Sequence, residues 1–433
     1  MLKQFELKNG LKVVTYSIPQ MRSVFLAISV KGGSVFDAKE TSGAAHFMEH
    51  LLVQAIPSFP TVEQLSAFME SLAGGYNAST GFGSIRFNAS APAIYTDDLL
   101  KIAGEVFYEP LFKEDDLERE RGAVMQEISQ RQDALWYKNG KFFREVRFKK
   151  DHPIQLDGGG SPEAVMKLQK KDLVDYWEKF FDPKNSYLVI VGGFDNDVIE
   201  EKIQDTFKKY TSKKGFSGFP KITNEDLLGR KVAIREDKEL KTCYVDLSFP
   251  ATVGNDLIKV RSSYRIARAI LGNLRSSRLF TELRQRRGLV YDVGFGASSF
   301  EDYGYGSINS QVSVEYLDEV ISIIAKELKR FVEEGPTKAE LDNAKNIAKN
   351  QSLMQFDHPL GIASWIEGDL LWEDKIYTPE EDVEIIESIT QADIMDTIIK
   401  SWDFKKLQLV IQGPIADSKE NIKKYTNLIK DLK

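Results

Sequence analysis

The order of apolar and polar positions along the chain predicts both strands and helices. Alternating residues on either side of Asn9-Gly10 predict a β-hairpin over residues 5–14. Longer segments with helical patterning lie at residues 61–72, 113–128, 261–271 and 341–353. Together these segments predict an α+β fold.

One pattern occurs twice. Residues 171–193 align without gaps to residues 392–414, with Asp172 matched by Asp393 and a Leu-Val-Ile run in both copies. Each copy predicts a helix that leads into a buried strand ending at a glycine. The helix at 341–353 resembles the one at 117–128 in the same way. We therefore expect two tandem homologous domains, each a mostly antiparallel sheet packed with helices.

The expected domain boundaries follow from the repeat and from local composition. Residues 212–229 are rich in Gly, Ser and Pro near their start, as is typical of a linker. The first domain is then 1–211 and the second 230–433. At 433 residues the chain is long enough for two cores.

Composition narrows the class of protein. A net charge of −7 argues against binding to nucleic acid or to an anionic membrane surface. No apolar run is long enough to span a bilayer, and the chain opens on the hairpin, not on a secretory signal. The single cysteine, Cys243, excludes an internal disulfide and favours a reducing compartment. We expect a cytoplasmic protein.

The strongest chemical signal is the segment His46-Phe47-Met48-Glu49-His50. Residues spaced by three and four share one face of a helix, so His46, Glu49 and His50 project together. Only four residues of the chain are histidine, and two of them are in this segment, so chance is a poor explanation. Buried imidazoles and a carboxylate need polar partners, which a metal ion would supply. The pattern predicts a zinc site.

A catalytic zinc ion needs a third protein ligand. His152 and His358 are next to prolines in loop-like contexts. The acidic helix at 113–128 offers Glu120 and Glu127, which are seven residues apart and therefore lie on one face. One of them could bind the metal and the other orient a ligand, and spacing alone does not say which.

The inverted order H-x-x-E-H is the inverzincin signature. On this motif the chain resembles the pitrilysin, insulin-degrading enzyme and mitochondrial processing peptidase family of zinc metallopeptidases. The resemblance implies that His46, His50 and Glu127 bind Zn²⁺ and that Glu49 is the general base. It also implies that Glu120 does not bind the metal but orients one of the metal ligands.

The second domain has a different candidate role. Its helix at 261–271 has no histidine, and Gln351 takes the place of Glu127, so only the first domain is expected to bind metal. Gly288 is placed to end a helix, which would bring Arg284 and Tyr291 together. The simple alternative is an arginine-rich helix end and a packed tyrosine. The resemblance implies instead that this pair binds the peptide backbone and stabilises the tetrahedral intermediate.

The segment Gly74–Thr80 resembles the family's edge strand, on which an extended peptide pairs with Asn77 and Ala78. An ordinary hairpin edge is the alternative. Downstream, Gly81-Phe82-Gly83-Ser84 departs from the family pattern. That departure affects the expected substrate preference and not the chemistry.

These features predict a zinc-dependent endopeptidase that hydrolyses oligopeptides or unfolded segments. In full-length relatives the Arg-Tyr pair and the zinc belong to different halves, so the resemblance implies a homodimer with shared active sites. Each subunit would form half of a clamshell chamber. The alternatives are a processing-peptidase subunit that needs a distinct partner, and a noncatalytic scaffold. Scaffold relatives typically lose the metal residues, which this chain retains.

Overall fold

The computed structural model describes residues 2–149, 152–212, 218–221, 228–229, 231–251, 257–299, 304–372 and 375–432. Much of the predicted linker, residues 213–217 and 222–227, lies outside these ranges. The chain forms two compact units. The first comprises residues 1–134, 153–220 and 355–377, and the second comprises residues 135–152, 221–354 and 378–433.

The first unit is built on a six-stranded sheet in the order β1-β2-β6-β3-β5-β4. The predicted hairpin is confirmed, because β1 and β2 pair antiparallel with Glu6 opposite Lys12. The central strand β6 is buried along its whole length, whereas β4 is the outermost strand. The strands are β1 (Leu2–Glu6), β2 (Lys12–Ser17), β3 (Ser23–Lys31), β4 (Gly75–Thr80), β5 (Ser84–Pro92) and β6 (Ser186–Gly192).

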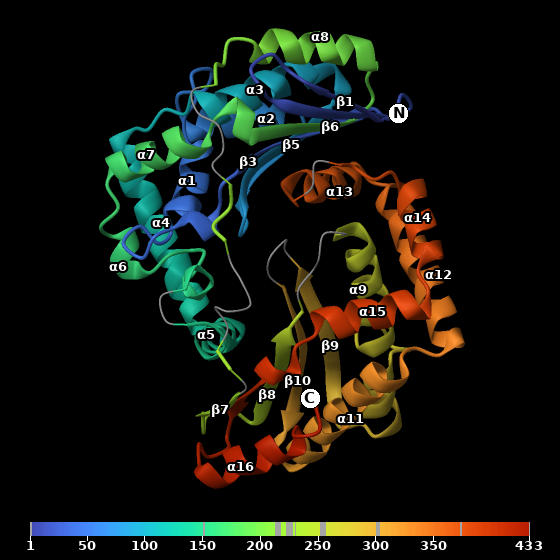
Figure 1. Ribbon diagram of the computed structural model, residues 1–433. Helices are drawn as coiled ribbons and strands as arrows, with labels where there is room; N and C mark the ends of the chain where they lie inside the picture. Colours follow the sequence, from blue (N-terminus) through green and yellow to red (C-terminus); the bar gives the residue numbers. More distant parts are fainter. Residues whose placement is uncertain are drawn as a thin grey trace. The chain divides into compact units, whose positions relative to one another are not determined.

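Helices cover both faces of this sheet (Figure 1). The main core lies between one face and helices that include α1, α3, α7 and α8. The helices of the unit are α1 (Ala44–Leu52), α2 (Val62–Ser71), α3 (Thr96–Tyr108), α4 (Glu114–Asp133), α6 (Pro162–Val165), α7 (Lys170–Phe180), α8 (Asn196–Phe207) and α13 (Pro359–Trp372).

The second unit repeats this plan with a five-stranded sheet in the order β7-β11-β8-β10-β9. Apart from β1, the two orders match strand for strand, and each sheet contains one parallel pair, β2 with β6 and β7 with β11. The predicted tandem homologous α+β domains are therefore confirmed. The strands are β7 (Lys231–Glu236), β8 (Thr242–Pro250), β9 (Val290–Ser299), β10 (Gly304–Ser313) and β11 (Gln408–Gly413).

The helical elements of the second unit are α5 (Leu135–Arg147), α9 (Leu257–Leu271), α10 (Arg278–Phe280), the π-helix η6 (Thr281–Arg286), α11 (Leu317–Glu334), α12 (Lys338–Gln355), α14 (Pro379–Ser388), α15 (Gln391–Ser401) and α16 (Lys419–Leu428). Within the described ranges, none of the helices is both long enough and apolar enough to cross a bilayer.

Two helices are exchanged between the repeats. α13 comes from the second half of the sequence but packs on the first sheet, where Ile362 and Ile366 contact the β6 residues Val189 and Val191. Ion pairing holds it there, because Arg86 Nη2 lies 2.8 Å from Glu367 Oε2.

α5 makes the reciprocal exchange, packing on the second sheet through Val146, Ala233 and Val410. There Arg147 Nη2 lies 3.1 Å from Asp246 Oδ1. Each unit therefore needs a helix from the other half of the sequence.

Candidate metal centre

Helix α1 begins at Ala44, directly after Gly43, which has a φ of 94° and no side chain that can cap the helix. Asp37, which is almost fully buried, takes over that role. Its carboxylate oxygens accept hydrogen bonds from the backbone N–H groups of Gly43, at 2.8 Å, and Ala45, at 3.2 Å. Burial raises the pKa of Asp37 to about 7, against the effect of these two hydrogen bonds. Asp37 fixes the start of the helix that carries the two histidines.

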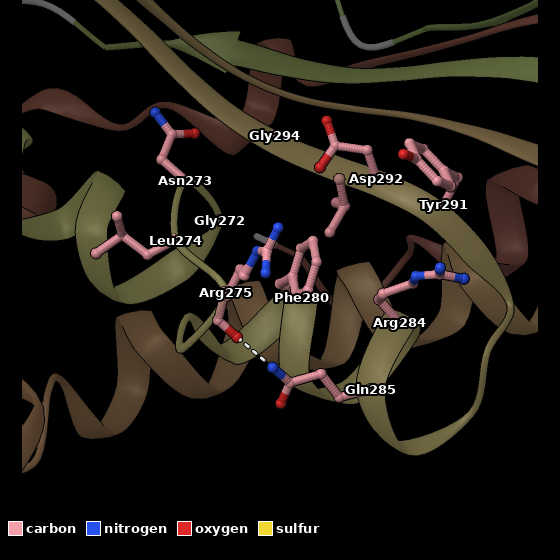
Figure 2. Close-up of a pocket in the computed structure, with 11 residues that line it drawn as sticks. Gly272, Asn273, Leu274, Arg275, Phe280, Arg284, Gln285, Tyr291, Asp292 and Gly294 are labelled. Carbon is pink, nitrogen blue, oxygen red and sulfur yellow. Dashed lines mark hydrogen bonds between the residues drawn. The ribbon is translucent and has the colours of Figure 1, made fainter.

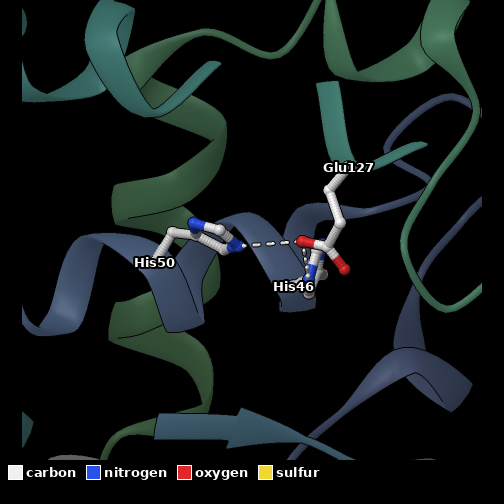
Figure 3. A group of neighbouring side chains, drawn as sticks. All are labelled: His46, His50 and Glu127. Atoms are coloured by element: carbon white, nitrogen blue, oxygen red, sulfur yellow. Dashed lines mark ion pairs between the residues drawn. The ribbon is translucent and has the colours of Figure 1, made fainter. Parts of the chain in front are cut away.

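The remaining residues of α1 anchor it in the core. Ala45, Phe47, Met48 and Leu52 are fully or nearly fully buried, so the helix has one orientation on the sheet. Figure 3 shows His46 and His50 on the same side of this helix, facing Glu127. The predicted shared face of the motif is the side that points toward α4.

Three potential ligand atoms converge at this point. Glu127 Oε2 lies 3.4 Å from His46 Nε2 and 3.5 Å from His50 Nε2. One ligand atom from each residue lies within 4.8 Å of the other two. Zinc–ligand bonds of 2.0–2.1 Å in a tetrahedral site place neighbouring ligand atoms about 3.3 Å apart. The observed separations and the His₂Glu donor set therefore suit zinc.

Two further side chains orient these potential ligands. Glu120 Oε2 lies 3.0 Å from His50 Nδ1, which leaves the Nε2 atom of that ring facing Glu127. Arg131 Nη2 lies 3.5 Å from Glu127 Oε1, so Oε2 is the oxygen that faces the imidazoles. Such contacts behind a metal ligand fix its orientation.

Burial and neighbouring charges set the protonation of the site. Burial, followed by the charge of His50, lowers the pKa of His46 to about 4, so its ring is neutral at pH 7. Burial alone would lower the pKa of His50, but the hydrogen bond that its ring donates to Glu120 and the nearby carboxylates raise it. Burial raises the pKa of Glu49, despite its hydrogen bond to Thr80. A raised pKa suits a carboxylate that must both take up and release a proton.

The other two histidines, His152 and His358, make contacts elsewhere in the chain. The ring of His152 stacks on that of Phe148, with 4.8 Å between centroids. His358 Nδ1 accepts a hydrogen bond from the backbone N–H of Leu360 at the start of α13. Among the described residues, His46, His50 and Glu127 form the one group of His, Cys, Asp or Glu suited to a metal.

The predicted edge strand, β4, lies beside α1, the helix that contains His46 and His50. β4 is at the edge of the first sheet, and Thr80 at its end donates a hydrogen bond to the backbone oxygen of Ala45 in α1. Asn77 pairs with Asn88 and Ala78 with Phe87 on the inner neighbour β5. Among the strands that the structure describes, none pairs with the outer backbone edge of β4.

Arg284 and Tyr291 come together within the second unit, as Figure 2 shows. The guanidinium carbon of Arg284 lies 5.2 Å from the centroid of the Tyr291 ring, and Tyr291 is 83% exposed. Gly288, with a φ of 65°, follows the helical segment, as predicted.

Both residues are on irregular backbone. Arg284 is in the π-helix η6, and the β9–β10 register shifts next to Tyr291. Such irregularities often occur at functional sites, where they redirect side chains.

The second unit has a different arrangement where the first has its histidines. In α9, which follows β8 as α1 follows β3, Arg265 donates hydrogen bonds to Asp382 Oδ2 at 2.9 Å and Ser352 Oγ at 3.0 Å. Ser352 lies on α12, the counterpart of α4. Arg265 thus joins α9 to α12 through Ser352 and to α14 through the carboxylate of Asp382.

Comparison with protein families agrees with this asymmetry. A family model described as insulinase, peptidase family M16, matches residues 12–141, and one described as the peptidase M16 inactive domain matches residues 167–348. The chain belongs to the M16 peptidase family. The first match contains the histidine helix and Glu127, and the second contains α9 and η6.

Relatives of this M16 member have similar lengths. A protein of Rickettsia bellii described as a zinc protease is 26% identical over 94% of this chain and 97% of its own length. A Bacillus subtilis protein, described as the zinc protease YmxG, is 24% identical over 82% of this chain and 85% of its own length. The chain is therefore similar to proteins described as zinc proteases over most of its own length and most of theirs.

Solved structures share the fold. A protease from Helicobacter pylori matches with a TM-score of 0.83 at 19% identity, covering 96% of this chain and 99% of its own. A Pseudomonas fluorescens structure described as a peptidase M16 inactive domain matches with a TM-score of 0.84 at 16% identity, covering 97% of this chain and 99% of its own. Both therefore contain counterparts of the two units.

Proposed function

We propose that this chain is a zinc-dependent endopeptidase that hydrolyses oligopeptides or unfolded segments bound in an extended conformation. The observation that carries the proposal is the convergence of His46 Nε2, His50 Nε2 and Glu127 Oε2 on one point. Glu49 projects from the same helix face, and the free edge of β4 lies alongside. Ligands, a proton acceptor and a peptide-binding edge thus occur together in one unit.

Bound zinc would supply Lewis acidity, which acidifies a water molecule and polarises a carbonyl group. Glu49 is too close in sequence to both histidines to serve comfortably as a further ligand. It instead takes the proton from the attacking water and passes it to the leaving amine. Its partial burial raises its pKa, which favours the first of these transfers, the uptake of the proton from water.

The free edge of β4 holds the substrate. An extended peptide adds to a sheet edge through main-chain hydrogen bonds, which are independent of side-chain identity. Asn77 and Ala78 provide the groups that pair with it. Because Thr80 at the end of β4 bonds to α1, a peptide on this edge lies close to Glu49.

Arg284 and Tyr291 stabilise the negative charge that develops on the carbonyl oxygen. We assign this role to the pair of a second copy of the chain, so that two identical subunits share their active sites and enclose a chamber. Support comes from the two family matches in this chain, one to the M16 peptidase and one to the M16 inactive domain, and from a relative that it covers over 97% of that relative's length. The single buried cysteine fits a reducing compartment, and we assign the enzyme to the cytoplasm.

The chemistry is tested with a quenched fluorogenic oligopeptide and a zinc measurement on the purified protein. Glu49→Gln should retain zinc and lose at least about 100-fold in kcat. Glu70→Gln, an exposed change on α2, is the matched control and should retain full activity. Cleavage by Glu49→Gln at the native rate refutes the assignment of the base, and absence of zinc from the native protein refutes the metal site.

Site sharing is tested by mixing subunits. Neither Arg284→Ala nor Glu49→Gln should cleave alone, whereas a mixed dimer contains one site with both native residues and should recover activity. Mixed dimers isolated through two different affinity tags that remain inactive contradict sharing. Inactivity of the pure native protein, together with bound zinc, favours a processing subunit that needs a distinct partner.

A further inference from the structure

Five arginines gather in the second unit, and their partners divide them into two groups. Arg278 pairs with Glu340, Arg286 with Glu282, and Arg287 with both Glu282 and Glu319. Among the described residues, neither Arg275 nor Arg284 has a carboxylate partner. An arginine left without an acid is available for an anionic group of a ligand.

The two arginines without an acid line the same cavity, which has a volume of about 620 Å³. Figure 2 shows Arg275 on the loop before α10 and Arg284 on η6, on either side of Phe280. The loop is tied to η6, because Gln285 Nε2 donates to the backbone oxygen of Arg275 at 2.8 Å. The spacing of the two guanidinium-bearing segments is therefore fixed by the fold.

Other lining residues favour a peptide ligand. Asn273 also lines the cavity, and because its Oδ1 accepts from the backbone N–H of Phe295 at 3.0 Å, its amide N–H₂ is the group left to donate. Tyr291 and Phe280 offer aromatic surface. Asp292 also lines the cavity, so its three charged side chains leave one net positive charge, which matches one carboxylate.

We propose that the cavity lined by Arg275 and Arg284 is a subsite in which Arg275 binds a carboxylate of the peptide, either its C-terminal group or an acidic side chain. The inference rests on the proposed peptidase function and adds a substrate class to it. Arg284 contacts the peptide near the reacting carbonyl, and Arg275 selects for a negative charge beyond that point. The enzyme therefore prefers peptides with a carboxylate at this position to neutral ones.

Binding to the zinc-depleted full-length protein tests the subsite separately from catalysis. Four fluorescent peptides of one sequence are compared by anisotropy at low salt: with a free or amidated C-terminus, and with Glu or Gln near that end. The native protein should bind the matching acid at least about tenfold more tightly than its neutral counterpart. Preference for the free terminus identifies one source of the carboxylate, and preference for Glu identifies the other.

Arg275→Gln should abolish this preference, while the matched control Arg286→Gln, a paired arginine outside the cavity lining, should retain it. Equal binding of acidic and neutral peptides by the native protein overturns the proposal. Equal loss of preference in both variants also overturns it, because that result reflects overall charge. Failure of peptide cleavage with the acid preference intact would count against the peptidase assignment and not against the subsite.

Discussion

Arg131 and Glu127 are one helical turn apart on α4, with Arg131 Nη2 3.5 Å from Glu127 Oε1. The arginine has this position because Gly159 leaves room for it. A Cβ atom at residue 159 would lie 1.7 Å from Arg131 Nη2. Gly159 thus supports the orientation of Glu127, the third proposed zinc ligand.

We predict that Gly159→Ala displaces Arg131 and weakens zinc binding by about tenfold or more. Losses of this size are typical when a residue that orients a metal ligand is removed. Gly158→Ala is the matched control, because its Cβ would meet only the Ser34 side chain, at 3.4 Å or more. Competition with a chromogenic chelator measures both affinities. Equal affinities in the two variants would show that Arg131 does not position Glu127.

Glu120 should matter for zinc affinity without touching the metal. Glu120→Gln replaces the charged partner of His50 Nδ1 with an amide, and we expect zinc affinity to fall by about 10- to 100-fold. Glu114→Gln, at the exposed start of the same helix, should leave affinity unchanged. The same chelator competition gives both values, and native affinity in Glu120→Gln would contradict the role.

The sequence was sufficient to predict the shared face of His46, Glu49 and His50, because all three belong to one helix. The pairing of Arg284 with Tyr291 was also predictable, since Gly288 marks the turn between them. The prediction that Glu127 is the third ligand depended on the spacing between motif and ligand in the family that the chain resembles. Local periodicity cannot tell which of two acids on a neighbouring helix will face the histidines.

Asp37 and Arg131 were not predicted. The residue before α1 is a glycine, so the usual sequence signal for a cap is missing, and the carboxylate that caps the helix comes from six residues upstream of Gly43. The exchange of α5 and α13 was also missed. An amphipathic pattern shows that one helix face is buried but not which sheet covers it.

Breaking the ion pair between α13 and the first sheet should destabilise the folded protein. Glu367→Leu leaves Arg86 without its carboxylate in a site that is mostly buried, and we expect a loss of about 3 kcal/mol in the free energy of unfolding. The double variant Arg86→Leu/Glu367→Leu should be more stable than the single one, because no unpaired charge remains. Urea unfolding followed by circular dichroism measures each, and a double variant that is less stable than Glu367→Leu would contradict this account.

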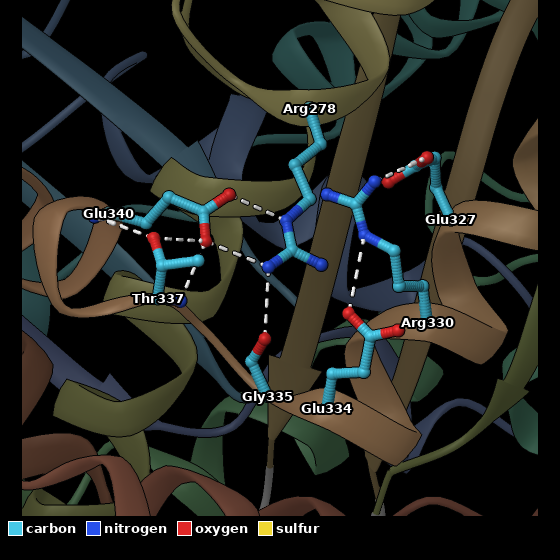
Figure 4. Close-up of polar contacts among 7 residues, drawn as sticks. All are labelled: Arg278, Glu327, Arg330, Glu334, Gly335, Thr337 and Glu340. Atoms are coloured by element: carbon cyan, nitrogen blue, oxygen red, sulfur yellow. Dashed lines mark hydrogen bonds and ion pairs between the residues drawn. The ribbon is translucent and has the colours of Figure 1, made fainter.

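A second ion pair predicts a pH dependence. Figure 4 shows Arg278 bonded to both oxygens of Glu340, at 2.6 and 2.8 Å. Burial acts to raise the pKa of Glu340, but the hydrogen bonds from Arg278 and Thr337 outweigh it and lower the pKa to about 2 from 4.5. The ionised form is therefore favoured by folding. Its stabilisation is complete above pH 4.5 and is lost as the pH falls toward 2.

Glu340→Gln should accordingly be less stable than the native protein at pH 6, by about 1–2 kcal/mol after allowance for partial exposure. The difference should shrink at pH 3.5. Glu334→Gln is the control, since its contact with Arg330 is long, at 3.9 Å, and its side chain is 69% exposed. Urea midpoints at the two pH values test this, and a difference independent of pH would contradict it.

The exchanged helices also determine where the chain can be divided. A fragment of residues 1–211 would lack α13, so Val189 and Val191 on the first sheet would be open to water, and its own α5 would have no sheet to cover. Such a fragment should aggregate, although it contains all three proposed zinc ligands. The part of the chain that contains the proposed zinc ligands is therefore not an independent folding module.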